Sequence, residues 1–113
     1  MTDSVGACHL LIKYAGSRNP VSRRTNMSTV HITEDAARAE LLDIKKVITK
    51  DNFRDMASER SDCGSFQNGG DLGKFSHGAM MKPFEDATYS LNINEISGIV
   101  ATDSGLHLIM RYA

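Results

Sequence analysis

The first apolar segment of the chain is Ala7-Cys8-His9-Leu10-Leu11-Ile12-Lys13-Tyr14. It predicts a β-strand, because it is short, almost wholly apolar and followed by a polar stretch that contains glycine. Successive side chains of a strand point to opposite faces. One face of this strand therefore carries His9, Leu11 and Lys13. The opposite face carries Cys8, Leu10 and Ile12.

The end of the chain predicts a β-hairpin. A strand over Gly98–Thr102 is followed by a turn at Asp103-Ser104-Gly105 and a second strand over Leu106–Tyr112. Alternation places His107, Ile109 and Arg111 on one face of the last strand. If the first and last strands pair, His9 and His107 are able to meet.

Three helices are predicted between these strands. Thr33 has the character of an N-cap, and an apolar stripe follows it at helical spacing through Ala37, Leu41, Ile44 and Ile48. A second helix is expected from about Asp51 to just before Ser61, and a third begins at Pro83.

The segment Gly69-Gly70-Asp71-Leu72-Gly73 predicts a loop or tight turn, and a short strand is expected near Lys74-Phe75-Ser76. The order of elements indicates an α+β domain with a small, mainly antiparallel sheet.

Residues 15–33 show no periodicity, and we call them the basic loop. Between Asp3 and Glu34 there is no carboxylate, whereas Lys13, Arg18, Arg23 and Arg24 all lie there. This stretch carries +4, so the rest of the chain carries -5 to give the formal net charge of -1. A solvated surface is the simplest explanation, but arginine forks also suit phosphate oxygens.

Length and composition limit the function classes. A chain of 113 residues with 41% hydrophobic residues predicts one domain that folds alone. The net charge of -1 argues against a nucleic-acid binder and a membrane ligand. The start of the chain lacks a secretion signal, and the two cysteines are too few for a disulfide framework. We therefore expect a monomer in the cytoplasm, the nucleus or both, without nucleic-acid or membrane partners.

The residues that carry chemistry allow several interpretations. His9 and His107 are either core histidines whose nitrogens are hydrogen-bonded or catalytic residues. His31 and His77 are expected on the surface. Cys63 is either a small buried residue or a nucleophile, although no nucleophile motif surrounds it. A zinc site is disfavoured because Cys8 and His9 point to opposite faces, so we expect no metal and no other cofactor.

Five linked motifs resemble one family along nearly the whole chain, from about Ala7 to Tyr112. They are His9-Leu-Leu-Ile-Lys13, Ser61-Asp-Cys63, Gly70-Asp-Leu-Gly73-x-Phe75, Met80-x-Lys-Pro83-Phe84-Glu-Asp-Ala87 and Thr102-Asp-Ser-Gly105-x-His107. Their order and spacing are similar to those of the parvulin-type peptidyl-prolyl cis/trans isomerases. The Pin-type branch, which acts on phosphoserine-proline and phosphothreonine-proline bonds, is the most similar.

The resemblance implies a four-stranded antiparallel sheet wrapped by about four helices. Residues 1–6 would be a short leader and residues 7–113 a single catalytic domain without the WW domain that such proteins often carry. The catalytic residues implied are His9, Cys63, Thr102, Ser104 and His107. The pocket for the substrate proline would be formed by Leu72, Met80 and Phe84.

The phosphate would be held by Lys13 and Arg18. Pin-type enzymes usually have two consecutive arginines in this loop, but here the second is Asn19. Phosphate binding would then be weaker or differently shaped, unless Arg23 or Arg24 compensates. An isomerase without phosphate preference, a non-catalytic phosphopeptide-binding module and a cysteine hydrolase remain alternatives.

Overall fold

The computed structural model describes residues 4–113. The elements along the chain are β1 (Ser4–Ile12), α1 (Glu34–Val47), α2 (Phe53–Arg60), the 3₁₀ helix η1 (Gly64–Asn68), β2 (Asp71–Ser76), α3 (Lys82–Ser90), β3 (Val100–Thr102) and β4 (Gly105–Arg111). The expected α+β fold with four strands is confirmed. Within residues 4–113 the sheet is accompanied by three α-helices and one 3₁₀ helix, where about four helices were expected.

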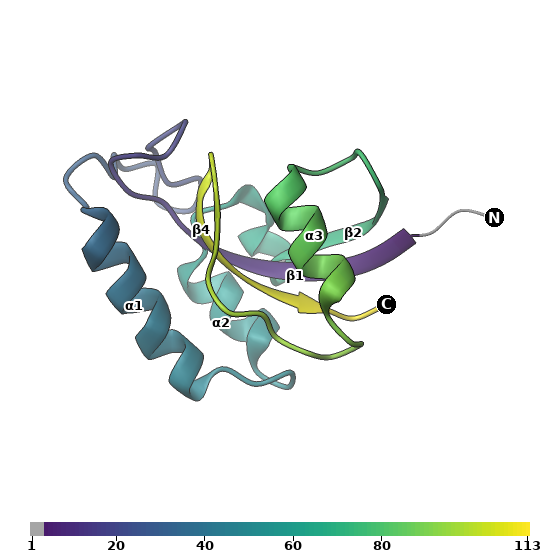
Figure 1. The fold of residues 1–113 in the computed structure, drawn as a ribbon. Coiled ribbons are helices and arrows are strands. Elements are labelled where there is room, and N and C mark those ends of the chain that lie inside the picture. Colours follow the sequence, from purple (N-terminus) through teal and green to yellow (C-terminus); the bar gives the residue numbers. More distant parts are fainter. Residues whose placement is uncertain (1–3) are drawn as a thin grey trace.

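The sheet has the strand order β2-β1-β4-β3, and every neighbouring pair is antiparallel (Figure 1). The first and last strands therefore pair at its centre. Opposite one another in this register are His9 and Ile109, and likewise Leu11 and His107. This register brings the two histidines to diagonal positions on the same face, which confirms the pairing that the sequence required for them to meet.

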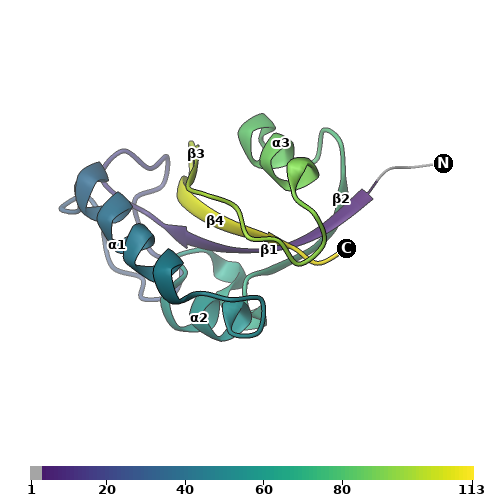
Figure 2. The same cartoon turned by 60° about the horizontal axis from the view of Figure 1, so that its bottom comes forward.

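The two faces of the sheet are covered by different helices. Figure 2 shows α1 and α2 on one side and α3 on the other. Cys8, Leu10 and Ile12 face α1 and α2 in the larger core cluster. On the other face, Phe84 of α3 packs with Val5, Ala7, Phe75, Leu91 and Ile109. The alternation within β1 thus separates the face of the larger core cluster from the face that carries His9, Leu11 and Lys13.

The helix termini follow the signals in the sequence. The Thr33 hydroxyl accepts a hydrogen bond from the backbone N–H of Ala36 at 3.1 Å, as expected of an N-cap. Pro83 lies in the first turn of α3, where its missing N–H leaves no bond unmade. Helix α2 ends at Arg60, just before Ser61.

Two expected boundaries are wrong. Residues 4–6 belong to β1 rather than to a leader, because Ser4 and Val5 pair with Ser76 and Phe75 of β2. Residues 1–3 of that leader lie outside the described residues. The second strand begins at Asp71 rather than near Lys74, so the last part of the glycine-rich segment is extended.

Gly70 fixes the entry into β2. It has φ +79°, and its carbonyl accepts the backbone N–H of His9 at 2.9 Å. A Cβ at this position would lie only 2.2 Å from the His9 carbonyl oxygen. Only glycine permits both the left-handed conformation and this close approach.

The basic loop has a folded structure without helix or strand. The Thr29 N–H donates to the Pro20 carbonyl at 2.7 Å, and Val21 and Ser28 form an isolated antiparallel bridge. The loop closes where the Ala15 N–H donates to the Ile32 carbonyl at 2.8 Å. Among the described residues no helix has the length and apolar character to cross a membrane.

Candidate functional site

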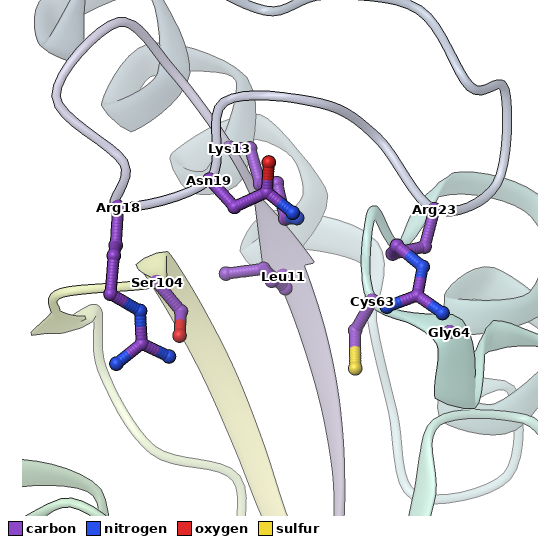
Figure 3. A pocket seen from close by; sticks show the side chains of 8 residues that line it. All are labelled: Leu11, Lys13, Arg18, Asn19, Arg23, Cys63, Gly64 and Ser104. Atoms are coloured by element: carbon purple, nitrogen blue, oxygen red, sulfur yellow. The ribbon is translucent and has the colours of Figure 1, made fainter.

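A pocket opens where the end of β1 meets the basic loop (Figure 3). Its lining comes from β1, the basic loop, the segment after α2 and the β3–β4 turn, and consists of Leu11, Lys13, Arg18, Asn19, Arg23, Cys63, Gly64 and Ser104. Figure 3 shows Arg18 on the side of Ser104 and Arg23 on the side of Cys63. Cationic side chains therefore flank the pocket on both sides.

Lys13 lies between the loop and the sheet. Its Nζ donates to the Val21 carbonyl at 2.8 Å, and its backbone N–H donates to the Asp62 carboxylate at 2.9 Å. Burial lowers the pKa of Lys13, and the nearby Asp62 carboxylate acts in the opposite direction. An ammonium group has three N–H donors. After the bond to Val21, two donors remain for an anion.

Backbone hydrogen bonds hold the two arginines that line the pocket. The Arg18 N–H donates to the Asp103 carbonyl at 2.7 Å, which attaches one end of the loop to the β3–β4 turn. The Arg23 N–H donates to the Asp62 carbonyl at 2.9 Å, next to Cys63. These bonds fix the main chain that carries the two guanidinium groups.

Arg24 does not join this pocket. It lines a second hollow together with Arg60 and Asp62, and its Nη2 lies 4.0 Å from Asp62 Oδ1. Arg23 and Arg24 were the two candidates to compensate for Asn19. The structure places Arg23 in the pocket and Arg24 in the second hollow.

His9 and His107 form a buried pair on the face of the sheet that also carries Leu11; neither lines the pocket itself, and we call this pair the histidine floor. Their Nδ1 atoms lie 2.9 Å apart, within hydrogen-bond distance. The pair continues at both ends, because His107 Nε2 lies 2.7 Å from the Thr102 hydroxyl and His9 Nε2 lies 3.2 Å from the Ser65 hydroxyl. All four ring nitrogens therefore have a partner.

The two imidazoles are neutral at pH 7. Burial lowers the pKa of His9 to about 4. Burial, with a smaller contribution from the neighbouring His9, lowers the pKa of His107 to about 3. A neutral imidazole has one N–H and one bare nitrogen, so only one ring donates in the Nδ1–Nδ1 bond. The choice of donor then fixes both tautomers and the roles of Thr102 and Ser65.

Cys63 and Ser104 lie on opposite sides of the pocket (Figure 3). Cys63 is half-buried and free, and its sulfur points into the pocket. The backbone N–H of Ser104 donates to the Thr102 hydroxyl oxygen at 3.1 Å. This bond connects the β3–β4 turn to the histidine pair through Thr102.

The three residues proposed for the proline pocket all belong to the core cluster beside the histidines. Phe84 is buried and meets both imidazoles edge to face, with ring centroids 5.5 Å from His9 and 5.2 Å from His107. Leu72 and Met80 are partly buried and pack against the same cluster. Phe84 therefore packs directly on the two neutral rings. We call Phe84, Leu72 and Met80 the apolar wall; none of the three lines the pocket described above.

Two neighbours of the site residues are not evident from the sequence. The hydroxyl of Ser65 in η1 contacts His9 of β1, and no spacing in the sequence indicates this contact. Asp62 accepts the Lys13 N–H through its side chain and the Arg23 N–H through its carbonyl. Its only sequence signal is its place between Ser61 and Cys63.

Metal ligation has no candidate in the part of the chain that the structure describes. No group of three or more His, Cys, Asp or Glu side chains lies in an arrangement able to hold an ion between residues 4 and 113. His31 and His77 are exposed, as expected; His77 contacts Glu85 and stacks on Tyr89.

Comparisons with known proteins cover nearly the whole chain. Residues 1–111 match the PPIC-type PPIase domain. The chain is 46% identical over 116 residues to the peptidyl-prolyl cis-trans isomerase NIMA-interacting 1 of Theileria annulata, with 98% of the chain and 81% of the relative covered. It is also 46% identical to the peptidyl-prolyl cis-trans isomerase Pin1 of Arabidopsis thaliana over 115 residues, 98% of the chain and 97% of that protein.

A solved structure has a similar fold. The solution structure of TbPIN1 is similar with a TM-score of 0.89 and 55% identity, and the match covers 100% of both chains.

Proposed function

Because the chain belongs to the PPIC-type family of peptidyl-prolyl cis/trans isomerases, we propose that it isomerises the bond before proline where the preceding residue is phosphoserine or phosphothreonine. The isomerase activity follows from the family. The preference for phosphate is our inference from the pocket.

The reaction requires rotation and no bond cleavage. An X–Pro bond faces a barrier of about 18–20 kcal/mol and isomerises in tens to hundreds of seconds without a catalyst. Only groups that bind the twisted amide better than either planar isomer lower this barrier. The enzyme needs a pocket for the ring, an anchor for the preceding residue and donors fixed near the amide.

The histidine floor and the apolar wall supply the first need. Phe84, Leu72 and Met80 offer a surface for the proline ring. The histidine floor beside this wall is neutral, so it places no charge next to the amide. The role of the floor is to shape the site and to fix the donors around it. Cys63 in this mechanism sets the polarity of the pocket and forms no covalent bond.

The observation that carries the phosphate preference is the convergence of Lys13, Arg18 and Arg23 on one pocket that also contains Cys63 and Ser104. A phosphorylated side chain carries about -1.5 to -2 charges at neutral pH. Charge-assisted hydrogen bonds from guanidinium and ammonium groups are about twice as strong as neutral ones. A phosphate held there anchors the residue before proline while the ring rests on the apolar wall.

Cis/trans exchange measured by NMR tests this proposal. Three matched peptides are compared, with phospho-Ser-Pro, Ser-Pro and Glu-Pro at the centre. We expect fastest catalysis for the phosphopeptide, weaker catalysis for Glu-Pro and least for Ser-Pro. Equal acceleration of the phosphorylated and unphosphorylated peptides would contradict the phosphate preference and leave the isomerase activity standing.

An isomerase without phosphate preference is the second candidate, and Asn19 favours it. This amide lines the pocket where the Pin-type pattern has an arginine. The substitution Asn19→Arg separates the two candidates. If phosphate is the anchor, added charge at this position raises kcat/KM for the phosphopeptide by about 3-fold and leaves Ser-Pro unchanged. An unchanged phosphopeptide rate would favour the second candidate.

A further inference from the structure

A buried carboxylate lies directly behind the phosphate pocket. The Asp62 side chain is 3% exposed, and it accepts the backbone N–H of Lys13 at 2.9 Å. The next residue, Cys63, lines the pocket itself. A negative charge so close to a phosphate site repels a dianion, and burial reduces the screening of that repulsion by water.

Arg60 pairs with this carboxylate from outside the pocket. Its Nη1 lies 3.1 Å from Asp62 Oδ1. Arg60 is held in turn by Glu40 of α1, through the contact of Nη2 with Oε1 at 2.9 Å and that of Nε with Oε2 at 2.5 Å. The guanidinium fork is therefore fixed by one carboxylate and presented to another.

Arg60 does not line the phosphate pocket. Arg60 lines the second hollow behind the basic loop with Arg24 and Asp62. Arg24 is a poorer partner, because its Nη2 lies 4.0 Å from Asp62 Oδ1 and its Nε is buried without a hydrogen-bond partner among the described residues. Of the two arginines, Arg60 therefore makes the closer ion pair with Asp62.

We propose that Arg60 is a positioning residue that determines specificity: it neutralises Asp62 and so allows Lys13, Arg18 and Arg23 to act together on a phosphate dianion. This inference rests on the proposed function. With Arg60 in place, the three cations of the pocket keep their full effect. Without Arg60, the buried Asp62 carboxylate cancels part of the positive potential that these cations produce in the pocket.

The decisive variant is Arg60→Gln, which removes the charge and keeps a hydrogen-bond donor. KM and kcat are measured for the phospho-Ser-Pro peptide, and the Ser-Pro peptide serves as the uncharged reference. We expect KM for the phosphopeptide to rise about 5-fold, which is the effect of one unit charge at close range when water still screens most of the interaction. The kcat of both peptides and the KM of Ser-Pro stay at the wild-type values.

Two further variants distinguish charge from folding. Arg60→Lys keeps the charge and is expected to restore most of the phosphopeptide affinity. The double variant Arg60→Gln/Asp62→Asn removes both charges, so its KM for the phosphopeptide returns towards the wild-type value. A merely structural role of Arg60 predicts the opposite, because the double variant would then be at least as impaired as the single one.

The outcomes separate the two proposals. If the wild-type enzyme treats both peptides alike, the proposed function fails. If the wild type prefers the phosphopeptide and Arg60→Gln retains the same preference, only the role of Arg60 is overturned. Where Arg60→Gln does not fold, the folded double variant decides: a wild-type KM for the phosphopeptide supports neutralisation, and a raised KM overturns it.

Discussion

The histidine floor and the basic loop meet in one site but are held together by different forces. The floor lies on β1 and β4, where His9 and His107 are 4% and 3% exposed and are hydrogen-bonded to each other through their Nδ1 atoms. In the loop, Arg18 and Arg23 are exposed residues. The backbone N–H of Arg18 donates to Asp103, and that of Arg23 donates to Asp62. Core packing fixes the floor, whereas backbone hydrogen bonds and the bond from Lys13 Nζ to the Val21 carbonyl hold the loop.

This difference predicts which changes affect every substrate and which affect only phosphorylated ones. A change in the floor alters the fold and the common chemistry together. A change in the loop alters a charge near solvent and leaves the core intact. Each substitution below is a test of that division.

The largest effect is expected for Phe84→Ala, in the apolar wall that packs on the histidine floor. Phe84 is 4% exposed and touches both imidazoles, so truncation opens a cavity and removes the wall of the proline pocket. The free energy of unfolding should fall by about 3–5 kcal/mol, measured by urea denaturation. Catalysis should slow for all three peptides in the NMR exchange assay.

Leu91→Ala is the matched control for Phe84→Ala. Leu91 belongs to the same core cluster and is 9% exposed, but it makes none of the ring contacts of Phe84. It should lose stability and keep the activity of each folded molecule. If Leu91→Ala impairs activity as much as Phe84→Ala, the proline wall has no special part in catalysis.

Gly70→Ala should have the next largest effect. The new methyl group would meet the His9 carbonyl, and we expect a loss of about 3 kcal/mol in the free energy of unfolding. Gly78→Ala is the control, because Gly78 also has positive φ, at +90°, but no atom lies within 4 Å of its Cβ position. That variant should lose only about 1–2 kcal/mol, from backbone strain. Equal losses would show that the close approach to His9 adds nothing.

These two regions also differ in how far the sequence predicts them. Alternation along β1 and β4 placed His9 and His107 on one face, and pairing of the strands was enough to bring them together. The boundary of β2 was missed because the glycines around it indicate a turn, whereas Asp71 is extended through its pairing with Cys8 of β1, which no local pattern shows.

The loop could not be predicted in the same way. Its charge was visible in the sequence, but nothing in a stretch without periodicity distinguishes Arg23 from Arg24. The difference arises from the hydrogen bond of the Arg23 N–H to the Asp62 carbonyl, which turns the two neighbouring side chains to different hollows. Contacts between residues distant in sequence, such as Ser65 with His9, are likewise absent from any local pattern.

In the loop, Arg18→Ala should reduce kcat/KM for the phosphopeptide about 10-fold, which corresponds to about 1.4 kcal/mol of transition-state stabilisation. Catalysis of Ser-Pro and the free energy of unfolding should stay unchanged, because the Arg18 N–H to Asp103 bond involves only the backbone. Arg24→Ala is the matched control, since Arg24 lies outside the pocket. A smaller loss for Arg18→Ala than for Arg24→Ala would contradict the assignment of the phosphate site.

The smallest effect separates the two regions by pH. The phosphate has a second pKa of about 6, so catalysis of the phosphopeptide should fall as pH drops through 6. The Ser-Pro peptide has no such group, and the pKa values of His9 and His107 are lowered to about 4 and about 3. Between pH 5 and 8 its catalysis should therefore stay constant, as NMR exchange rates at each pH will show.

The same pKa values set the direction of acid destabilisation. In the unfolded chain a histidine titrates near pH 6.5, above the folded values, so protons bind more tightly to the unfolded state. The contribution of the neutral pair to stability is complete above about pH 6.5 and is lost as pH falls towards 4 and then 3. Urea midpoints should decline over that range, and less steeply in His107→Gln. A Ser-Pro rate that instead follows a titration near pH 6.5 would show that the floor acts through a charged imidazole, and the division between the two regions would fail.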